Sequence, residues 1–217
     1  MGKTRILLVD DHQVVLGGIK SALEEYPEFS VVAEARDGRE GVKKVLQHKP
    51  DIVIMDLSLP DLNGVDATMQ IKRAVPNTRV IIFTMYSDRE YVISLLKAGI
   101  SGYVLKEDSI SDLVLAVQAV RRGGTYFSTT APKVWQECGK FLERPGRALD
   151  GFDSLTLRER EVLQLFAEGC SVKDVASKLH LSPKTVETHK YHIMEKLGAC
   201  SVVELARIAI RKKLIQA

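Results

Sequence analysis

The 217-residue sequence predicts an α/β domain with a doubly wound, five-stranded parallel sheet, followed by a small all-helical domain of four helices. Three observations lead to this prediction. Short runs rich in Val, Ile and Leu alternate with longer amphipathic segments over the first 125 residues. A Pro- and Gly-containing stretch ends this alternation, and only helical spacing follows it. Strands that alternate with helices are typical of a parallel sheet with helices on both faces.

The predicted strands are short and almost continuously apolar, as strands buried on both faces of a parallel sheet must be. They span residues 5–10, 30–35, 51–56, 79–84 and 102–106. The segments between and after them have helical length and apolar spacing. These predicted helices span residues 12–25, 38–48, 64–74, 88–98 and 109–122. The α/β domain therefore occupies residues 1–125.

Residues 126–151 are predicted to be a linker, because Pro and Gly recur there and Trp135 lies in a weakly helical stretch. Residues 152–217 carry helix start signals at regular intervals. These signals are the capping boxes 156–159 and 201–204, their acidic variant at 171–174, and Ser182-Pro183. Gly169 and Gly198 stand where two of these helices are expected to stop.

Composition excludes several classes of protein. Hydrophobic residues make up 45% and charged residues 27%, as in ordinary globular proteins, and no apolar run approaches the roughly 18 residues of a membrane helix. With no signal-peptide pattern at the N-terminus, we expect a cytoplasmic protein without a membrane partner.

The three cysteines lack ligand spacing, so reduced thiols are expected rather than zinc or disulfides. Residues 152–217 hold 11 Lys and Arg against 8 Asp and Glu, a mildly basic balance that alone does not establish nucleic-acid binding.

Polar side chains stand at the ends of four predicted strands. Asp10 and Asp11 end the first strand, and Asp56, Thr84 and Lys106 end three others. The carboxyl ends of the strands in a doubly wound sheet meet at the crevice where ligands bind, so we expect these side chains to share one pocket. Close carboxylates repel one another unless a cation neutralises them, and Mg²⁺ prefers such oxygen ligands. A carboxylate beside Mg²⁺, with Lys and Thr to hold phosphoryl oxygens, is equipped to form an aspartyl phosphate.

These residues resemble the receiver domain of bacterial response regulators over about the first 125 residues. The resemblance is carried by Asp10-Asp11, residues 51–64 (DIVIMDLSLPDLNG), Thr84, and residues 102–106 (GYVLK). It implies a flavodoxin-like sheet with strand order 2-1-3-4-5. It also implies that Asp56 is the phosphoacceptor.

The resemblance further implies a role for each neighbouring residue. Mg²⁺ is expected on Asp56, on Asp11 directly, on Asp10 through water, and on the backbone carbonyl of Ser58. Thr84 and Lys106 are expected to contact the phosphoryl oxygens, and Tyr103 to change rotamer when Thr84 moves toward the phosphate. Taken alone, Thr84 and Tyr103 are also ordinary strand residues, so that simpler interpretation stays open.

A helix-turn-helix pattern lies in the C-terminal domain, with a short helix Val172–Leu179, a turn at 180–182, and a longer helix Pro183–Leu197. The second helix of this motif lies in the major groove of DNA. At about 100° per residue, Val186, Ile193 and Leu197 share the face toward the bundle. The other side carries Lys184, Thr188, Tyr191 and Glu195, with Glu187 and His192 at its edges. The side chains expected to meet phosphates are Lys184, Thr185, Lys190 and Lys196. A plain helical hairpin with a solvated polar face shows the same pattern.

Residues 152–217 also resemble the LuxR-type helix-turn-helix domain. The resemblance is carried by residues 155–163 (LTLREREVL), 167–169 (AEG), 181–189 (LSPKTVETH) and 196–198 (KLG). Joined to a receiver, it implies a response regulator of the NarL/FixJ family. In that family bases are read from the positions of Glu187, Thr188 and Tyr191, and Glu187 suits a cytosine amino group.

Two surfaces are candidates for a homodimer. The last predicted helix, 201–214, has Val202, Leu205, Ile208 and Ala209 on one face, which fits either the core alone or the core and the dimer contact that the family places there. The resemblance also suggests a receiver dimer through residues 88–98 and 109–122.

The leading hypothesis is a two-component response regulator, which is not an enzyme. A sensor histidine kinase phosphorylates Asp56, and this switches sequence-specific binding to double-stranded DNA and transcription. The alternative is a constitutive DNA-binding regulator whose receiver serves only for dimerisation. A Mg²⁺-dependent phosphatase is a third hypothesis, but it needs a second acid two residues after the nucleophile, where Ser58 stands.

Overall fold

The computed structural model describes residues 2–86, 89–128, 152, 154–212 and 214–215. The chain divides into two compact units, Met1–Pro145 and Gly146–Ala217. Most of the predicted linker, including Trp135 and Cys138, lies outside the described residues. No helix in the described part of the chain is both long enough and apolar enough to cross a membrane.

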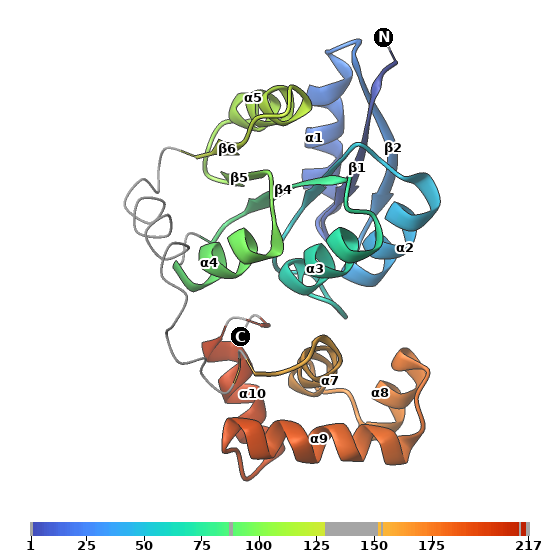
Figure 1. The fold of residues 1–217 in the computed structure, drawn as a ribbon, viewed down its shortest axis with the longest axis vertical. Coiled ribbons are helices and arrows are strands. Elements are labelled where there is room, and N and C mark those ends of the chain that lie inside the picture. Colours follow the sequence, from blue (N-terminus) through green and yellow to red (C-terminus); the bar gives the residue numbers. More distant parts are fainter. Residues whose placement is uncertain (1, 87–88, 129–151, 153, 213, 216–217) are drawn as a thin grey trace. The chain divides into compact units, whose positions relative to one another are not determined.

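The N-terminal unit is a six-stranded parallel sheet with helices on both faces (Figure 1). In spatial order its strands are β2 (Phe29–Ala35), β1 (Thr4–Val9), β3 (Ile52–Met55), β4 (Arg79–Thr84), β5 (Gly102–Leu105) and β6 (Tyr126–Phe127). One face is covered by α1 (Gln13–Glu24) and α5 (Ile110–Arg121), the other by α2 (Gly38–His48), α3 (Gly64–Ala74) and α4 (Arg89–Ala98). The doubly wound fold and the order 2-1-3-4-5 of the first five strands are confirmed.

The predicted number of strands is wrong by one, because β6 adds a sixth strand at the sheet edge. Gly102 pairs with Tyr126 and Tyr103 pairs with Phe127, and the Ser128 N–H donates to the Tyr103 carbonyl at 2.9 Å. Two residues are too few to show a strand period, so this element is invisible to pattern analysis. The segment predicted to be linker from residue 126 therefore begins as part of the sheet.

The sheet core explains why its strands form continuous apolar runs. Along β1, Leu7 and Val9 pack in the cluster under α2, α3 and α4, while Ile6 and Leu8 pack in the cluster under α1 and α5. All four side chains are at most 1% exposed. Burial on both faces removes the alternation of apolar and polar residues that a half-exposed strand shows.

The C-terminal unit has four helices among its described residues, α7 (Leu157–Ala167), α8 (Val172–Leu179), α9 (Pro183–Leu197) and α10 (Val202–Arg211). Each begins at a predicted N-cap whose side chain accepts a backbone hydrogen bond: Thr156, Ser171, Ser182 and Ser201. Gly169 and Gly198 follow α7 and α9 with φ of 88° and 64°, a conformation that favours glycine. The predicted helical bundle is thus confirmed, although α10 ends earlier than expected.

Candidate functional site

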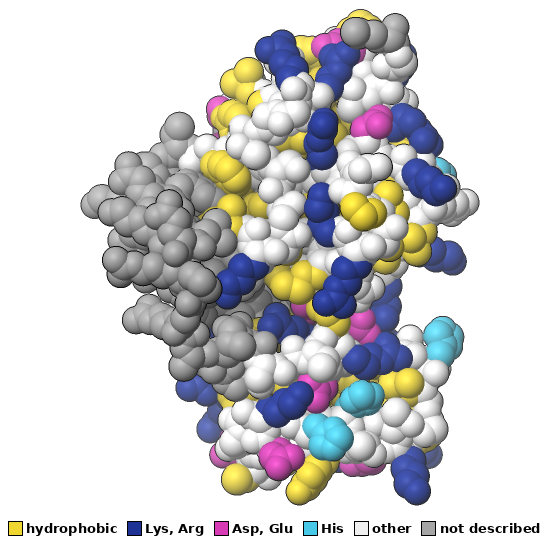
Figure 2. All heavy atoms as spheres, viewed as in Figure 1, with side chains coloured by type: hydrophobic (Ala, Val, Ile, Leu, Met, Phe, Trp, Pro, Cys, Tyr) yellow, Lys and Arg dark blue, Asp and Glu magenta, His cyan; other side chains and the backbone are white. Residues whose placement is uncertain are grey.

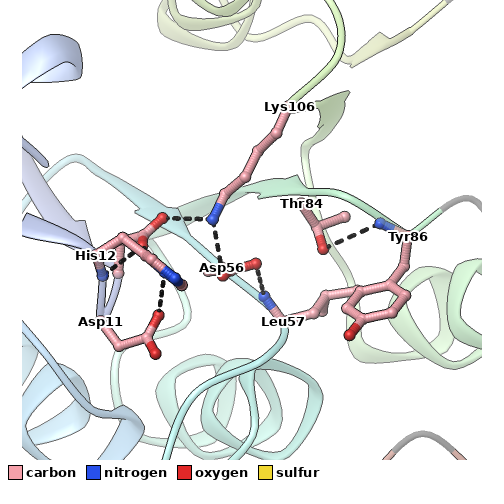
Figure 3. Close-up of polar contacts among 8 residues, drawn as sticks. Asp11, His12, Asp56, Leu57, Thr84, Tyr86 and Lys106 are labelled. Carbon is pink, nitrogen blue, oxygen red and sulfur yellow. Dashed lines mark hydrogen bonds and ion pairs between the residues drawn. The ribbon is translucent and has the colours of Figure 1, made fainter. Parts of the chain in front are cut away.

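Four of the predicted side chains meet where β1, β3 and β5 end (Figure 3). Asp10 and Asp11 follow β1, Asp56 follows β3, and Lys106 follows β5. The Lys106 Nζ lies 2.8 Å from Asp10 Oδ2 and 2.8 Å from Asp56 Oδ2. The Asp10 and Asp56 side chains are only 3% and 5% exposed, whereas that of Asp11 is 37% exposed. Two carboxylates are therefore buried around one ammonium group, and a third, Asp11, lies beside them with its side chain partly exposed.

The electrostatics of this pocket fit a divalent cation. The ligand atoms of Asp10, Asp11, His12 and Asp56 all lie within 4.8 Å of one another. Burial raises the pKa of Asp56, although the Lys106 ammonium opposes this. Burial alone lowers the pKa of Lys106, but its contacts with the carboxylates of Asp56 and Asp10 raise it overall. Three carboxylates and one lysine leave excess negative charge, which oxygen-preferring Mg²⁺ is suited to neutralise.

His12 is a pocket residue that sequence reasoning missed. Its Nδ1 lies 2.7 Å from Asp11 Oδ1 and 3.4 Å from Asp10 Oδ1, and its backbone N–H donates to Asp10 Oδ1 at 2.9 Å. The residue is the N-cap of α1, yet its side chain makes no capping hydrogen bond. Its only signal in the sequence is adjacency to Asp10 and Asp11.

Thr84 and Tyr103 are connected through the backbone of Tyr86. Thr84 ends β4 and is fully buried, and its Oγ1 accepts a hydrogen bond from the Tyr86 N–H at 3.4 Å (Figure 3). The Tyr86 carbonyl in turn accepts a hydrogen bond from the Tyr103 hydroxyl. Tyr103 is also fully buried, which raises its pKa. Tyr103 is therefore a buried strand residue whose hydroxyl is tied to the chain after β4. Tyr86 is a second residue of this site that the sequence did not reveal.

The loop after Asp56 is packed tightly against α3. The Leu57 N–H donates to Asp56 Oδ1 at 2.7 Å, and the Gly64 N–H donates to the Leu57 carbonyl at 2.9 Å. A Cβ on Gly64 would lie 2.1 Å from the Asp56 carbonyl oxygen, so only glycine permits this approach. Ser58 is half-buried in the same loop. The start of α3 thus fixes the backbone that carries Asp56.

In the C-terminal unit, α8 and α9 form the predicted helix-turn-helix. The turn begins at His180, whose φ of 52° is left-handed. Ser182 caps α9, and Pro183 occupies its first turn. Val186 and Ile193 are fully buried, so the predicted inward face of α9 is confirmed at these two positions.

The outward face of α9 presents a mixed set of polar side chains. The exposed members of the predicted DNA-contact set are Lys184, Thr185, Glu187, Thr188 and Tyr191. Lys190 is half-buried and forms an ion pair with Glu187 at 2.5 Å. The visible face of this unit intersperses basic, acidic, histidine and apolar side chains rather than forming one basic patch (Figure 2), in keeping with its small net charge.

Lys196 differs from the other predicted phosphate contacts. Its Nζ lies 2.7 Å and 2.9 Å from the two carboxylate oxygens of Glu159, and 3.4 Å from the Ser154 carbonyl. Glu159 belongs to the capping box of α7, and its side chain is 6% exposed. Lys196 therefore holds α7 and α9 together through this ion pair, and its role as a phosphate contact stays a prediction.

The face of α10 serves the core and also leaves apolar surface. Leu205 and Ala209 are fully buried. Val202, Val203 and Ile210 are 40%, 63% and 39% exposed. Exposed apolar side chains on one short helix are compatible with a contact between two copies of the domain.

Comparisons with known proteins agree with this architecture. Residues 6–118 match the family model of the response regulator receiver domain, and residues 153–209 match that of the bacterial regulatory proteins of the luxR family. The chain is 41% identical over 216 residues to the oxygen regulatory protein NreC of Staphylococcus epidermidis, covering 98% of this chain and 99% of that protein.

Solved structures of response regulators are also similar to this chain. The two-component response regulator RcsB in complex with DNA is 29% identical, with a TM-score of 0.59, and the match covers 95% of this chain and 97% of that one. The isolated receiver domain of RcsB from Salmonella enterica serovar Typhimurium, with the phosphomimetic BeF3⁻, is 27% identical over 61% of this chain and 99% of that one, with a TM-score of 0.58. The chain therefore belongs to the NarL-type family of two-component response regulators, DNA-binding transcription regulators that join a receiver domain to a LuxR-type helix-turn-helix domain.

Proposed function

We propose that Asp56 accepts a phosphoryl group from a sensor histidine kinase and that this modification switches binding of α9 to double-stranded DNA. The observation that carries the proposal is the Asp56 carboxylate itself, 5% exposed and 2.8 Å from Lys106 in a cluster of acidic groups. A carboxylate oxygen attacks the phosphorus of the phosphohistidine, the P–N bond breaks, and the imidazole leaves with the bonding electrons. Such transfer depends mainly on positioning and charge neutralisation.

The residues of the pocket divide these tasks. Asp56, Asp11, Asp10 through water, and the Ser58 backbone carbonyl are the groups we expect to hold Mg²⁺. When bound, Mg²⁺ neutralises charge on the carboxylates and on the phosphoryl oxygens. The Lys106 ammonium is expected to leave its shared position between two carboxylates and donate to the phosphoryl group.

The switch begins at Thr84. Its hydroxyl is expected to donate to a phosphoryl oxygen, which draws Thr84 away from the Tyr86 N–H. Since the Tyr86 carbonyl holds the Tyr103 hydroxyl, movement of the loop that contains Tyr86 changes the setting of Tyr103. A phosphoryl group shifts the equilibrium between two states only if it interacts differently with each, and Thr84 supplies that difference.

For DNA recognition we propose that α9 enters the major groove. Glu187, Thr188 and Tyr191 lie at base edges, while the phosphate contacts come from Lys184, Thr185 and Lys190. The ion pair between Glu187 and Lys190 opens so that each partner meets its own DNA group. A two-fold dimer through the exposed apolar residues of α10 would bind half-sites about one turn of DNA apart.

The test is the mass of the intact full-length protein after incubation with Mg²⁺ and acetyl phosphate. We expect wild type and the control variant Asp51→Asn to gain one phosphoryl group, and Asp56→Asn to gain none. DNA selected from a random pool by the phosphorylated protein should then bind the unmodified protein less tightly. No phosphoryl gain by folded wild type would contradict the proposal, and equal DNA affinity of the two forms would favour constitutive binding.

A further inference from the structure

We infer that His12 is a positioning residue of the cation site, which holds the Asp11 carboxylate ready to coordinate Mg²⁺. The inference rests on the proposed function, because it concerns the same pocket. His12 lies at the start of α1, directly after the two acidic residues that end β1 (Figure 3).

The three carboxylates of the pocket are not held equally. Asp10 accepts hydrogen bonds from the Lys106 Nζ and the His12 backbone N–H. Asp56 accepts hydrogen bonds from the same Nζ and from the Leu57 N–H. Within the described ranges, the Asp11 side chain has one close polar contact, the 2.7 Å approach of its Oδ1 to the Nδ1 of His12.

The contact between His12 and Asp11 joins one ring nitrogen to one carboxylate oxygen. An ionised carboxylate only accepts hydrogen bonds, so the 2.7 Å approach of His12 Nδ1 to Asp11 Oδ1 is favourable when Nδ1 carries the hydrogen. The contact engages Asp11 Oδ1, and the remaining lone pairs of the Asp11 carboxylate stay available to a cation. Because the Asp11 side chain is 37% exposed, it has more conformational freedom to lose on metal binding than the buried Asp10 and Asp56.

The N-terminus of α1 gives an independent observation. Ser, Thr, Asp and Asn are the usual N-cap residues, because their side chains accept a hydrogen bond from the first turn. His12 occupies this position and makes no such bond. Its ring lies instead against the two carboxylates that follow β1. The first turn of α1 therefore has no side-chain cap at His12, and the ring is available to hold the Asp11 carboxylate in place.

Some residues orient the ligands of a metal without binding the metal themselves. Removing such a residue lowers metal affinity by roughly 10- to 100-fold. The Asp11–His12 contact is partly exposed, so we expect the low end of that range. In full-length His12→Ala, the Kd for Mg²⁺ measured by titration calorimetry should rise about tenfold. His12→Asn should retain most of the wild-type affinity, because its amide N–H can reach the same Asp11 oxygen, and the control His48→Ala should be unchanged.

A second measurement separates positioning from other roles. The rate of phosphoryl gain from acetyl phosphate in His12→Ala should be low at limiting Mg²⁺ and return to the wild-type rate at saturating Mg²⁺. Wild-type Mg²⁺ affinity in His12→Ala, failure of His12→Asn to restore binding, or a rate defect that persists at saturating Mg²⁺ would each overturn the inference. Failure of wild type to bind Mg²⁺ at all would instead overturn the proposed function.

Discussion

Each unit of the chain buries a carboxylate against a lysine, but the two pairs have different surroundings. In the N-terminal unit, Lys106 is shared between Asp56 and a second carboxylate, and burial raises the pKa of Asp56. In the C-terminal unit, Lys196 contacts both oxygens of Glu159, and Thr156 adds hydrogen bonds from its backbone N–H and its hydroxyl. Burial alone raises the pKa of Glu159, but these donors lower it overall.

The number of donors per carboxylate separates a reactive pocket from a structural contact. Glu159 accepts from three donor groups, the Lys196 ammonium and the backbone N–H and hydroxyl of Thr156, so its ionised form stabilises the fold. One lysine for two buried carboxylates leaves the ionised form of Asp56 poorly compensated. That arrangement costs stability and prepares the site for a cation and a phosphoryl group, as functional sites often do.

The two lysines are expected to differ most in their effect on phosphoryl transfer. Lys106→Met should slow phosphoryl gain from acetyl phosphate on the order of 100-fold, because it removes a preorganised donor for the charge of the transferring group. Lys196→Met should leave this rate unchanged, since the contacts that the described residues make with Lys196 come from Ser154 and Glu159 of its own unit. The rates are measured by intact-protein mass against time. Equal rates in the two variants would contradict the functional distinction between the pairs.

The stability of the C-terminal unit should depend on Lys196, although the rate of phosphoryl gain should not. Removing one partner of a buried ion pair costs roughly 3–5 kcal/mol. The Lys196 side chain is 34% exposed, and solvent weakens the ion pair. We therefore expect Lys196→Met to lower the free energy of unfolding by about 2 kcal/mol. Hydrogen exchange of α7 and α9 in the full-length protein measures this locally. Lys190→Met is the control, because its partner Glu187 is 50% exposed and the loss should stay below roughly 0.5 kcal/mol.

Neutralising the reactive carboxylate should stabilise its own unit. Asp56→Asn removes a buried charge whose ionised form burial disfavours. In Mg²⁺-free buffer at neutral pH we expect the N-terminal unit to gain roughly 1 kcal/mol, read from the exchange of amide hydrogens in β1, β3 and β4. A loss of stability would show that Lys106 and the Leu57 N–H compensate the ionised Asp56 in spite of its burial.

The fold was predictable where the pattern is local. Two-sided burial gives the strands of the sheet their continuous apolar runs, and the capping boxes of Thr156 and Ser171 are complete within four residues. The edge strand β6 was not predictable, because a two-residue strand depends on the partner strand β5 rather than on its own period.

The site was predictable only in part, for the same reason. The carboxyl ends of neighbouring strands lie close together in a doubly wound sheet. The meeting of Asp10, Asp56 and Lys106 therefore follows from the fold class. The position of Lys196 on α9 suggests a phosphate contact, but a helical wheel does not include the Glu159 carboxylate that α7 brings to it. The contacts of His12 and Tyr86 likewise depend on loop geometry that sequence spacing does not encode.

Mild acid should move the two units in opposite directions. A carboxyl group whose folded pKa is raised binds protons more readily in the folded state, so Asp56 adds stability to its unit as the pH falls from neutral toward its usual value of 3.8. Glu159 has a lowered pKa, so its contribution is fully present above its usual value of 4.5 and is lost as the pH falls further.

Differences between wild type and matched variants isolate these two small effects from all other titrating groups. Wild type minus Asp56→Asn should show a stability of the N-terminal unit that increases with acid. Wild type minus Glu159→Gln should show a stability of the C-terminal unit that is flat above pH 4.5 and decreases below it. The measurement is hydrogen exchange of each unit in the Mg²⁺-free full-length protein, corrected for intrinsic exchange rates. If both differences had the same sign, donor number would not distinguish the two pairs, and burial alone would control both carboxylates.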